Sequence, residues 1–280
     1  MMPSSRNEKS ILVTGCSSGI GRLAALTLRE RGWRVFATVR RERDLIALRE
    51  TGLEACRLDL ADSASIREAM DWVLEQSGGR LDALFNNGAF GQPGALEDLS
   101  REALREQFEV NLFGTHELTR RIIPVMRAAG SGRIVQNSSV LGFVALRYRG
   151  AYIASKFALE GLTDTLRLEL AGSGIRVILI EPGPIATRFR ANGLAAFQRH
   201  IDAQGSIHRE AYRKEVARLG NETADTPFTL PPEAVVHRLI HALESPRPRL
   251  RYRVTAPTRI FAILKRILPA VWLDAILVRV

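Results

Sequence analysis

Short runs of β-branched and apolar residues alternate along this chain with longer amphipathic segments. Strands that alternate with helices in this way form parallel sheets, because each helix returns the chain to the starting edge of the sheet. Right-handed crossovers then place helices on both faces. The pattern therefore predicts an α/β protein with a single domain over residues 1–280 and one doubly wound, mostly parallel sheet of seven strands. The predicted strands span residues 11–14, 34–39, 54–58, 83–86, 133–137, 176–180 and 250–254.

Helical periodicity occurs at residues 21–31, 43–51, 63–76, 100–128, 150–170 and 232–243. Asp62 and Ser100 precede two of these segments, where a side-chain oxygen can accept the free amides of a first helical turn. Residues 184–231 and 256–280 fall outside the alternation. Because long segments outside the regular pattern of a compact domain usually serve a function, we expect residues 184–231 to cover a substrate.

The formal net charge is +10, from 40 Lys and Arg against 30 Asp and Glu. No basic run is interleaved with aromatic residues, so we expect no nucleic-acid partner. Cys16 and Cys56 lack the spacing of a disulfide framework or a metal site, and we expect no bound metal. The first ten residues lack the apolar core of a secretory signal, and no apolar stretch approaches the ~18 residues of a spanning helix. These features predict a cytoplasmic protein.

Residues 256–280 form an apolar tail that also carries Arg259, Lys265, Arg266 and Arg279. Such an amphipathic stretch can pack on its own domain or on a partner subunit, and we expect the protein to form a homo-oligomer. It can also make a peripheral contact with an anionic membrane surface. The sequence leaves these alternatives open.

A glycine-rich segment with the sequence TGCSSGIG, at residues 14–21, follows the first predicted strand and opens the first helix. Glycines there permit a tight turn and let the backbone approach a pyrophosphate, while the helix N-terminus supplies amide groups and partial positive charge. A plain strand-to-helix turn also uses glycine, but the strand before and the helix after favour a dinucleotide site in a Rossmann fold. The predicted cofactor-binding residues of this turn are Gly15, Ser17, Ser18, Gly19, Ile20 and Gly21.

The end of the second predicted strand distinguishes the two nicotinamide dinucleotides. An acidic residue there binds the ribose 2′-hydroxyl of NAD, but this chain has Val39 followed by Arg40 and Arg41. A guanidinium group can pair bidentately with the 2′-phosphate of NADP. We therefore predict NADP(H) as the cofactor, with Arg40 at the 2′-phosphate, although a solvated charged turn would have the same sequence.

Tyr152 and Lys156 are spaced i and i+4, which places them side by side on one face of the predicted helix 150–170. A tyrosine packed on an aliphatic lysine stem would have the same spacing. Ser139 lies 13 residues before Tyr152, just past the fifth strand, and Asn111 lies in the long preceding helix. A carbonyl that accepts a hydride needs a positioned acid, and a neighbouring ammonium favours the phenolate that the reverse reaction needs. Tyr152 therefore suits the role of acid and base in the interconversion of a carbonyl and an alcohol.

In the order and spacing of these motifs, the chain resembles the short-chain dehydrogenase/reductase family over about residues 10–190. The glycine spacing TGxxxGxG and the set Asn111, Ser139, Tyr152 and Lys156 match the family's pattern. The segment 86–89, with the sequence NNGA, is similar to the family's NNAG motif with the last two residues exchanged. The resemblance implies that Lys156 holds the nicotinamide ribose, that Ser139 hydrogen-bonds the substrate oxygen and that Asn111 holds a water leading to Lys156.

The resemblance implies further cofactor contacts after the third, fourth and sixth strands. Asp59 resembles the family's adenine-contacting aspartate, followed by Leu60, although an aspartate there can also cap a turn. Asn87 belongs to the NNAG-like motif. Pro182 belongs to a segment similar to the family's PG motif, and Thr187 is expected at the nicotinamide carboxamide.

The sequences of the motifs at residues 149–152 and 181–185 resemble those of the family branch that contains retinol, aldehyde and hydroxysteroid dehydrogenases. This implies a small lipophilic carbonyl or alcohol as the partner, such as an aldehyde, retinal or a ketosteroid. Apolar residues within 188–228 suit a pocket for such a substrate: Phe189, Leu194, Phe197, Ile201, Ile207 and Tyr212. One alternative is a non-catalytic, NADP-sensing regulatory protein on the same fold, which would not need all four catalytic residues. Another is a sugar-nucleotide epimerase, which usually has a larger C-terminal substrate domain.

Overall fold

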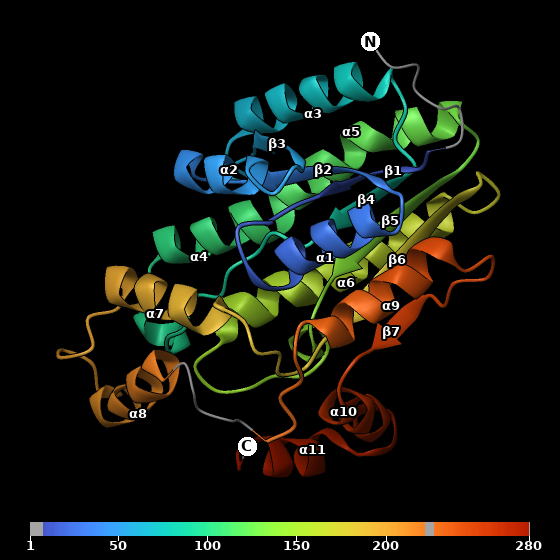
Figure 1. Cartoon of the computed structure of the whole chain (residues 1–280). Coiled ribbons are helices and arrows are strands. Elements are labelled where there is room, and N and C mark those ends of the chain that lie inside the picture. Colours follow the sequence, from blue (N-terminus) through green and yellow to red (C-terminus); the bar gives the residue numbers. More distant parts are fainter. Residues whose placement is uncertain (1–7, 222–226, 280) are drawn as a thin grey trace.

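Seven strands form one sheet in the order β3-β2-β1-β4-β5-β6-β7, and every neighbouring pair is parallel. The computed structural model describes residues 8–221 and 227–279. The strand order reverses between β1 and β4, as it does in a doubly wound Rossmann sheet (Figure 1), so the predicted fold class is confirmed. The strands are β1 (Ser10–Val13), β2 (Arg34–Val39), β3 (Glu54–Arg57), β4 (Ala83–Asn86), β5 (Gly132–Asn137), β6 (Ile175–Glu181) and β7 (Arg251–Arg253).

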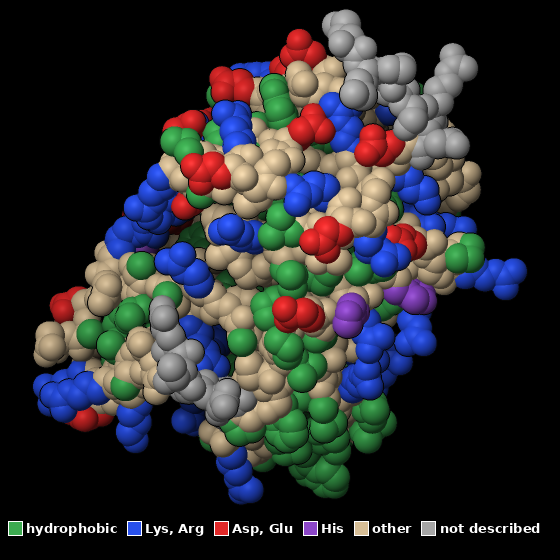
Figure 2. All heavy atoms as spheres, in the orientation of Figure 1, with side chains coloured by type: hydrophobic (Ala, Val, Ile, Leu, Met, Phe, Trp, Pro, Cys, Tyr) green, Lys and Arg blue, Asp and Glu red, His purple; other side chains and the backbone are tan. Residues whose placement is uncertain are grey.

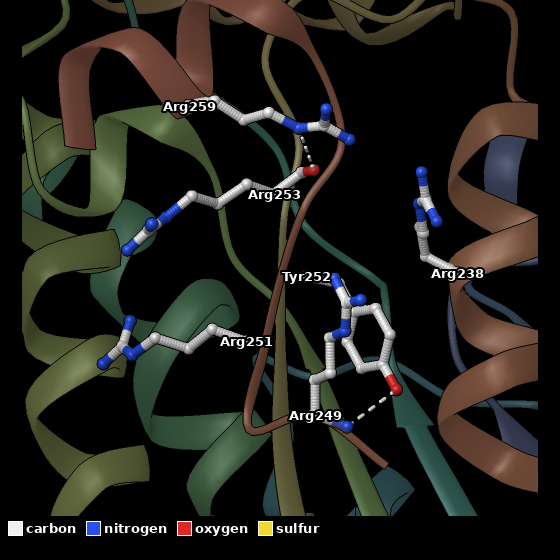
Figure 3. A pocket seen from close by; sticks show the side chains of 6 residues that line it. All are labelled: Arg238, Arg249, Arg251, Tyr252, Arg253 and Arg259. Carbon is white, nitrogen blue, oxygen red and sulfur yellow. Dashed lines mark hydrogen bonds between the residues drawn. The ribbon is translucent and has the colours of Figure 1, made fainter. Parts of the chain in front are cut away.

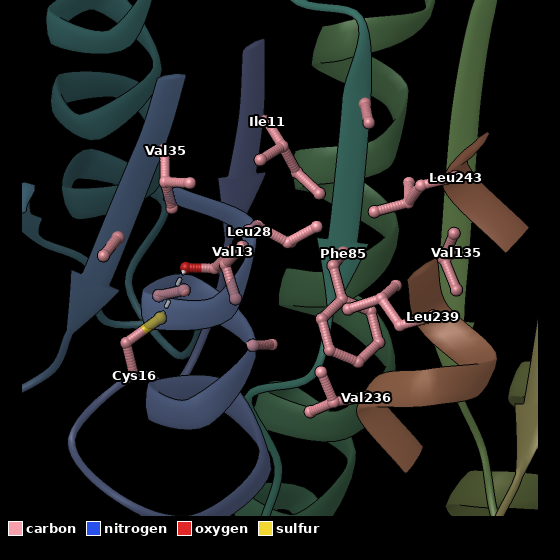
Figure 4. Close-up of a cluster of buried hydrophobic side chains, with 14 of the residues drawn as sticks. Ile11, Val13, Cys16, Leu28, Val35, Phe85, Val135, Val236, Leu239 and Leu243 are labelled. Carbon is pink, nitrogen blue, oxygen red and sulfur yellow. Dashed lines mark hydrogen bonds between the residues drawn. The ribbon is translucent and has the colours of Figure 1, made fainter. Parts of the chain in front are cut away.

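Helices cover both faces of the sheet, and each face buries its own apolar cluster. One face carries α1 (Gly19–Glu30), α2 (Glu42–Arg49) and α9 (Glu233–Glu244), and the other carries α3 (Ser63–Ser77), α5 (Thr115–Ala128) and α6 (Gly150–Glu169). On the first face, Leu28 of α1 and Leu239 of α9 pack with Phe85 of β4 (Figure 4). Because both faces are covered, the strands β1, β4 and β6 are mostly apolar, as buried parallel strands usually are, whereas the edge strands β3 and β7 carry charged residues.

The predicted helix over residues 100–128 begins where expected but is not uniform. The Ser100 side chain accepts the Ala103 amide at 3.2 Å and caps α4 (Arg101–Phe108), just as Asp62 accepts the Ala64 amide at 2.9 Å and caps α3. A π-helical turn, η2 (Glu109–Gly114), then separates α4 from α5. This wider turn brings Gly114 so close to the carbonyl of Leu60 that a Cβ would overlap it. The expectation of one continuous α-helix was therefore wrong at this turn.

The two segments outside the alternation are also helical. Residues 184–231 contain α7 (Phe189–His200), which lies beside α4, and α8 (Arg209–Gly220), which packs against α7 farther from α4 (Figure 1). The tail forms α10 (Ala256–Ile267) and α11 (Ala270–Leu277), below β7 and α9 in the same view. The shorter turns are η1 (Leu96–Asp98) and η3 (Val140–Gly142). In the described part of the chain, no helix is long and apolar enough to cross a membrane.

Candidate active site

The glycine-rich turn joins β1 to α1 at the carboxyl edge of the sheet. Gly15 has a φ of +73°, and a Cβ there would lie 2.8 Å from the Cα of Gly88. A Cβ on Gly21 would lie 2.6 Å from the side-chain nitrogen of Asn87. Ser18 precedes α1 without capping it through its side chain, so the amides of the first turn keep their free hydrogen-bonding capacity. We call this turn the glycine cradle. A side chain at Gly15 or Gly21 would fill the space in it, and without one the space fits the pyrophosphate of a dinucleotide.

The segment after β4 is fastened to this turn by hydrogen bonds. The Thr14 hydroxyl accepts the backbone amides of Asn87 and Gly88 at 2.9 and 2.8 Å, and the Asn87 side chain donates to the Thr14 carbonyl at 2.9 Å. Asn137, at the end of β5, donates to the Asn87 side-chain oxygen at 2.9 Å. The NNGA segment has glycine at position 88, where the NNAG motif has alanine. Position 88 is the point of this segment that lies closest to the backbone of Gly15.

The neighbouring edge, at the ends of β2 and β3, carries the residues expected near the adenosine half. Arg40 is exposed directly after β2, and the side chain of Arg57 donates to the Arg40 carbonyl at 3.2 Å. Arg57 pairs with Val39 in the β2–β3 register, a position that the sequence alone did not single out. Asp59 accepts the Ala61 amide at 3.0 Å and so stabilises its own turn, while Leu60 is buried near Gly88.

Tyr152, Lys156 and Ser139 lie together in one buried cluster. The ammonium of Lys156 donates to the Asn137 carbonyl at 2.7 Å and lies 5.8 Å from the centroid of the Tyr152 ring. The Ser139 oxygen accepts the Leu141 amide at 3.1 Å, which fixes it at the start of η3. Asn137 was missed by the sequence analysis, because its contact with Lys156 uses a backbone carbonyl that any residue could supply.

Burial sets the protonation states of this cluster. Desolvation raises the pKa of Tyr152 to about 12, and a hydrogen-bond interaction with Ser139 partly offsets this. Desolvation lowers the pKa of Lys156 to about 8, while the carboxylate of Glu160, one helical turn later, acts in the opposite direction. At neutral pH the phenol therefore carries its proton and can donate it to a substrate oxygen. Glu160, like Arg57 and Asn137, is a residue that the sequence analysis did not single out.

Asn111 lies in the π-helical turn and is buried. Its side-chain nitrogen donates to the Phe90 carbonyl at 2.9 Å and to the Ser155 hydroxyl at 3.2 Å, and its oxygen accepts the Phe90 amide at 3.1 Å. These bonds tie the π-helical turn between α4 and α5 to α6 and to the loop that follows β4. Single π-turns of this kind occur often at functional sites.

The segment after β6 closes the site against the glycine-rich turn. The Pro182 carbonyl accepts the Val140 amide at 2.7 Å, which joins this segment to η3. A Cβ on Gly19 would lie 3.1 Å from the methyl carbon of Thr187, so Thr187 sits beside the opening of α1. The predicted motif residues of β1, β4, β5 and β6 thus meet at one edge of the sheet.

The segment with α7 and α8, which was expected to cover a substrate at this edge and is here called the cover, differs from the expected apolar lining. Phe189 does lie against Tyr152, with ring centroids 5.3 Å apart. Phe197, Ile201 and Tyr212 instead bury themselves in a separate small core with Ala95, because two helices need an apolar contact of their own to hold together. Ile207 is exposed. The two histidines of the cover, His200 and His208, contact Glu106 and Glu97 at 2.8 and 2.6 Å.

Within the described residues, no group of three or more His, Cys, Asp or Glu side chains could hold a metal ion. The thiols of Cys16 and Cys56 are free and buried, and desolvation raises the pKa of each to about 12.

A parallel sheet with a glycine cradle at its switch point is the arrangement of dinucleotide-binding proteins. Residues 9–196 match the family model described as short chain dehydrogenase, and the chain belongs to that family. It is 42% identical over 270 residues to the uncharacterized oxidoreductase YbbO of Escherichia coli strain K12, covering 96% of this chain and 94% of that protein.

Two further comparisons agree with this assignment. The chain is 35% identical over 263 residues to 17-beta-hydroxysteroid dehydrogenase type 1 of Homo sapiens, covering 88% of this chain and 77% of that protein. The fold is similar to a short chain dehydrogenase/reductase from Burkholderia phymatum solved in complex with NAD, with a TM-score of 0.78 and 25% identity. That likeness covers 91% of this chain and 92% of the solved chain.

Proposed function

We propose that this protein is an NADP(H)-dependent oxidoreductase that interconverts a carbonyl and an alcohol. The observation that carries the proposal is the buried cluster of Tyr152, Ser139 and Lys156 beside a glycine cradle. The cradle, Asn87, Pro182 and Thr187 are proposed to hold the cofactor, with Asp59 and Leu60 at its adenine end. A single domain would comprise the whole chain, with residues 184–231 covering the substrate.

In this proposal, the bound nicotinamide supplies the hydride for reduction and accepts it for oxidation. Tyr152 transfers its phenolic proton to the substrate oxygen during reduction and takes the proton back during oxidation. Ser139 donates a hydrogen bond to the same oxygen, which stabilises the negative charge that develops there. Lys156 holds the nicotinamide ribose and places positive charge near the phenol, which favours the phenolate in the oxidation direction. Asn111 is proposed to hold a water that leads to Lys156.

The preference for NADP(H) rests on the guanidinium groups at the ends of β2 and β3. Arg40 and Arg41 follow β2, and Arg57 contacts the Arg40 backbone. Positions 39–41 contain no carboxylate that would repel a 2′-phosphate. A hydrogen-bonded charge pair with phosphate is stronger than a neutral hydrogen bond to a 2′-hydroxyl.

Replacing Arg40 tests this preference. We expect Arg40→Ala to weaken NADPH binding by roughly tenfold or more, because a hydrogen bond between charged groups contributes about 1.5–3 kcal/mol. NADH binding should change little. Titration of both cofactors by fluorescence measures the difference. Arg67→Ala, an exposed arginine on α3, is the matched control. Equal losses for NADPH and NADH would remove the 2′-phosphate role from Arg40.

The substrate is proposed to be a small lipophilic aldehyde, retinal or a ketosteroid. The ring of Phe189 against Tyr152 supports an apolar surface at the reacting end. The likeness to a hydroxysteroid dehydrogenase supports a substrate of this kind. We also propose that the protein is a homo-oligomer and that it is cytoplasmic. The free thiols of Cys16 and Cys56 support the location, because free thiols are typical of a reducing compartment.

Oxidation of NADPH with a panel of aliphatic aldehydes, retinal and ketosteroids tests the proposed reaction. We expect turnover with at least one lipophilic carbonyl and slower turnover with short polar ones. Tight NADPH binding without turnover across the panel would contradict the proposed reaction. That result would favour the alternative, a non-catalytic NADP-sensing regulator on the same fold.

A further inference from the structure

The last two described helices present apolar side chains to solvent. Ile260, Ile263 and Ile267 lie on one face of α10, at spacings of three and four residues, while α10 packs inward through Thr258 and Ala262. On α11, Val271 and Trp272 are 76% and 64% exposed. Figure 2 shows hydrophobic atoms gathered at the bottom of the molecule, where α10 and α11 lie in Figure 1. We call Ile260, Ile263, Ile267, Val271 and Trp272 the apolar ridge. Large exposed apolar patches usually mark a surface that binds another protein, a ligand or a membrane.

A hollow lined by arginines lies beside the ridge, with Arg259 of α10 on its wall. The hollow has a volume of about 350 Å³ and is lined by Arg238, Arg249, Arg251, Tyr252, Arg253 and Arg259 (Figure 3). We call it the arginine hollow. Figure 3 shows the side chains of Arg251 and Arg253 on one side of β7 and those of Arg238 and Arg249 on the other. Positive charge therefore lies on both sides of this strand, and nearby anions would stabilise it.

Carboxylates of the protein neutralise only part of this charge. Arg251 pairs with Glu160, Asp164 and Glu181, and Arg253 pairs with Glu181 at 3.3 Å. No described carboxylate lies within ion-pair distance of Arg238, Arg249 or Arg259. A guanidinium group without a carboxylate partner can pair bidentately with phosphate oxygens.

The tail adds further positive charge around the ridge. Lys265 and Arg266 are exposed near the end of α10, and Arg279 follows α11. The single acidic residue among positions 256–280 is Asp274. An apolar face rimmed by Lys and Arg is the form taken by helices that lie on anionic bilayers.

We propose that the apolar ridge and the arginine hollow together dock this protein on the surface of an anionic lipid bilayer. The ridge enters the boundary between headgroups and acyl chains, where Trp272 suits the mixed environment because its ring is apolar and its N–H is polar. The hollow takes lipid phosphate groups. A second copy of this chain fits less well, because symmetric pairing of the ridges would bring two positively charged rims together.

The docking surface lies next to the carboxyl edge of the sheet. Helix α10 contacts η3, the turn that begins directly after Ser139. A Cβ on Gly183, after β6, would lie 2.9 Å from the Thr258 hydroxyl of α10. The inference goes beyond the proposed reaction and does not depend on it, since vesicle binding can be measured without turnover.

Sedimentation of the full chain with lipid vesicles tests the docking surface. We expect binding to vesicles of phosphatidylcholine mixed with phosphatidylglycerol, little binding to phosphatidylcholine alone, and weaker binding as salt is raised. The variant Ile267→Ser/Val271→Ser/Trp272→Ser should lose at least about tenfold in partition coefficient, because it removes the apolar area that enters the bilayer. The variant Arg238→Gln/Arg249→Gln/Arg259→Gln should lose about fivefold per arginine that reaches the surface, and only with anionic vesicles.

Matched control variants distinguish binding through this surface from nonspecific binding to vesicles. Ile46→Ser/Leu168→Ser removes two exposed apolar residues elsewhere, and Arg80→Gln/Arg213→Gln removes two exposed arginines elsewhere. Both controls should bind vesicles like the unaltered chain, and thermal unfolding should confirm that every variant folds.

Three results would overturn the proposal. The first is equal sedimentation of the unaltered chain with and without vesicles. The second is an oligomer, seen by light scattering, that the ridge variant dissociates while no form binds vesicles, which would make the ridge an interface between copies. The third is stabilisation by inorganic phosphate that needs the hollow arginines but occurs without vesicle binding, which would make the hollow a site for free anions.

Discussion

Removing the hydroxyl of Tyr152 should lower the turnover number by about 10²- to 10⁴-fold, the range that a positioned acid contributes. The phenol is buried, and desolvation raises its pKa to about 12, so it holds its proton at neutral pH. Tyr152→Phe removes that proton but keeps the ring that packs against Phe189. We therefore expect NADPH affinity and thermal stability to stay close to those of the unaltered protein. Steady-state rates with the best carbonyl of the panel, together with NADPH titration, measure both.

Tyr148→Phe is the matched control, because it removes a phenol hydroxyl four residues earlier in the chain. Tyr148 precedes α6 and its ring contacts Tyr212 of the cover, 5.8 Å between centroids, rather than the Lys156 ammonium. Its turnover should fall by less than about tenfold. If Tyr152→Phe turned over at the unaltered rate, the phenol would not be the acid of the reaction.

The largest stability effect is expected at Arg251, on the edge strand β7. Its guanidinium contacts Glu160 of α6 and Glu181 of β6, whose side chains are only 9% and 1% exposed. Arg251→Met keeps much of the side-chain volume but leaves both carboxylates without their main partner. Removing one member of a buried ion pair costs about 3–5 kcal/mol, so we expect a loss of that size in the free energy of unfolding. Urea unfolding followed by tryptophan fluorescence measures it.

The loss should depend on pH in a defined direction. Desolvation raises the pKa of Glu160 above its ordinary value in the folded protein. A carboxyl whose pKa is higher in the folded state stabilises the fold while it is protonated, and this contribution is lost as the pH rises through the folded pKa. Arg251→Met removes a positive charge that lowers this pKa. The deficit of the variant should therefore be smaller near about pH 5 than near about pH 8.

Arg34→Met serves as the comparison for this variant. Arg34 pairs with Glu54 through two hydrogen bonds of 2.7 and 2.8 Å, but both side chains are partly exposed to water. An ion pair in such a position contributes about 1 kcal/mol or less. A loss at Arg251 no larger than the loss at Arg34 would show that the buried carboxylates find other partners.

The parts of the fold that the sequence predicted are those set by local patterns. The strands were recognisable because buried parallel strands are runs of β-branched and apolar residues, as in β6. The pair Tyr152 and Lys156 was recognisable because a helix brings residues four apart onto one face. Asp62 and Ser100 were recognisable as caps because their oxygens act on the helix that follows directly.

The parts that the sequence did not predict depend on contacts between distant segments. Arg57 reaches Arg40 only because β2 and β3 pair in a particular register. Arg251 meets Glu160 across 91 residues of chain, and nothing near either residue indicates the other. Large aromatic residues such as Phe197 and Tyr212 occur both in pocket linings and in cores. The sequence therefore did not show that these two form a separate core.

The close approach of Gly15 to Gly88 has a practical consequence for exchanging loops between relatives of this protein. The two segments, 14–21 and 86–89, touch through bare backbone, and the Thr14 hydroxyl accepts the amides of Asn87 and Gly88. A transplanted turn that carries alanine at position 88 would bring its extra methyl to 3.2 Å from Leu60 and 3.3 Å from Thr14. Chimeras that swap one of these segments alone should therefore fold less well than chimeras that swap both as a pair.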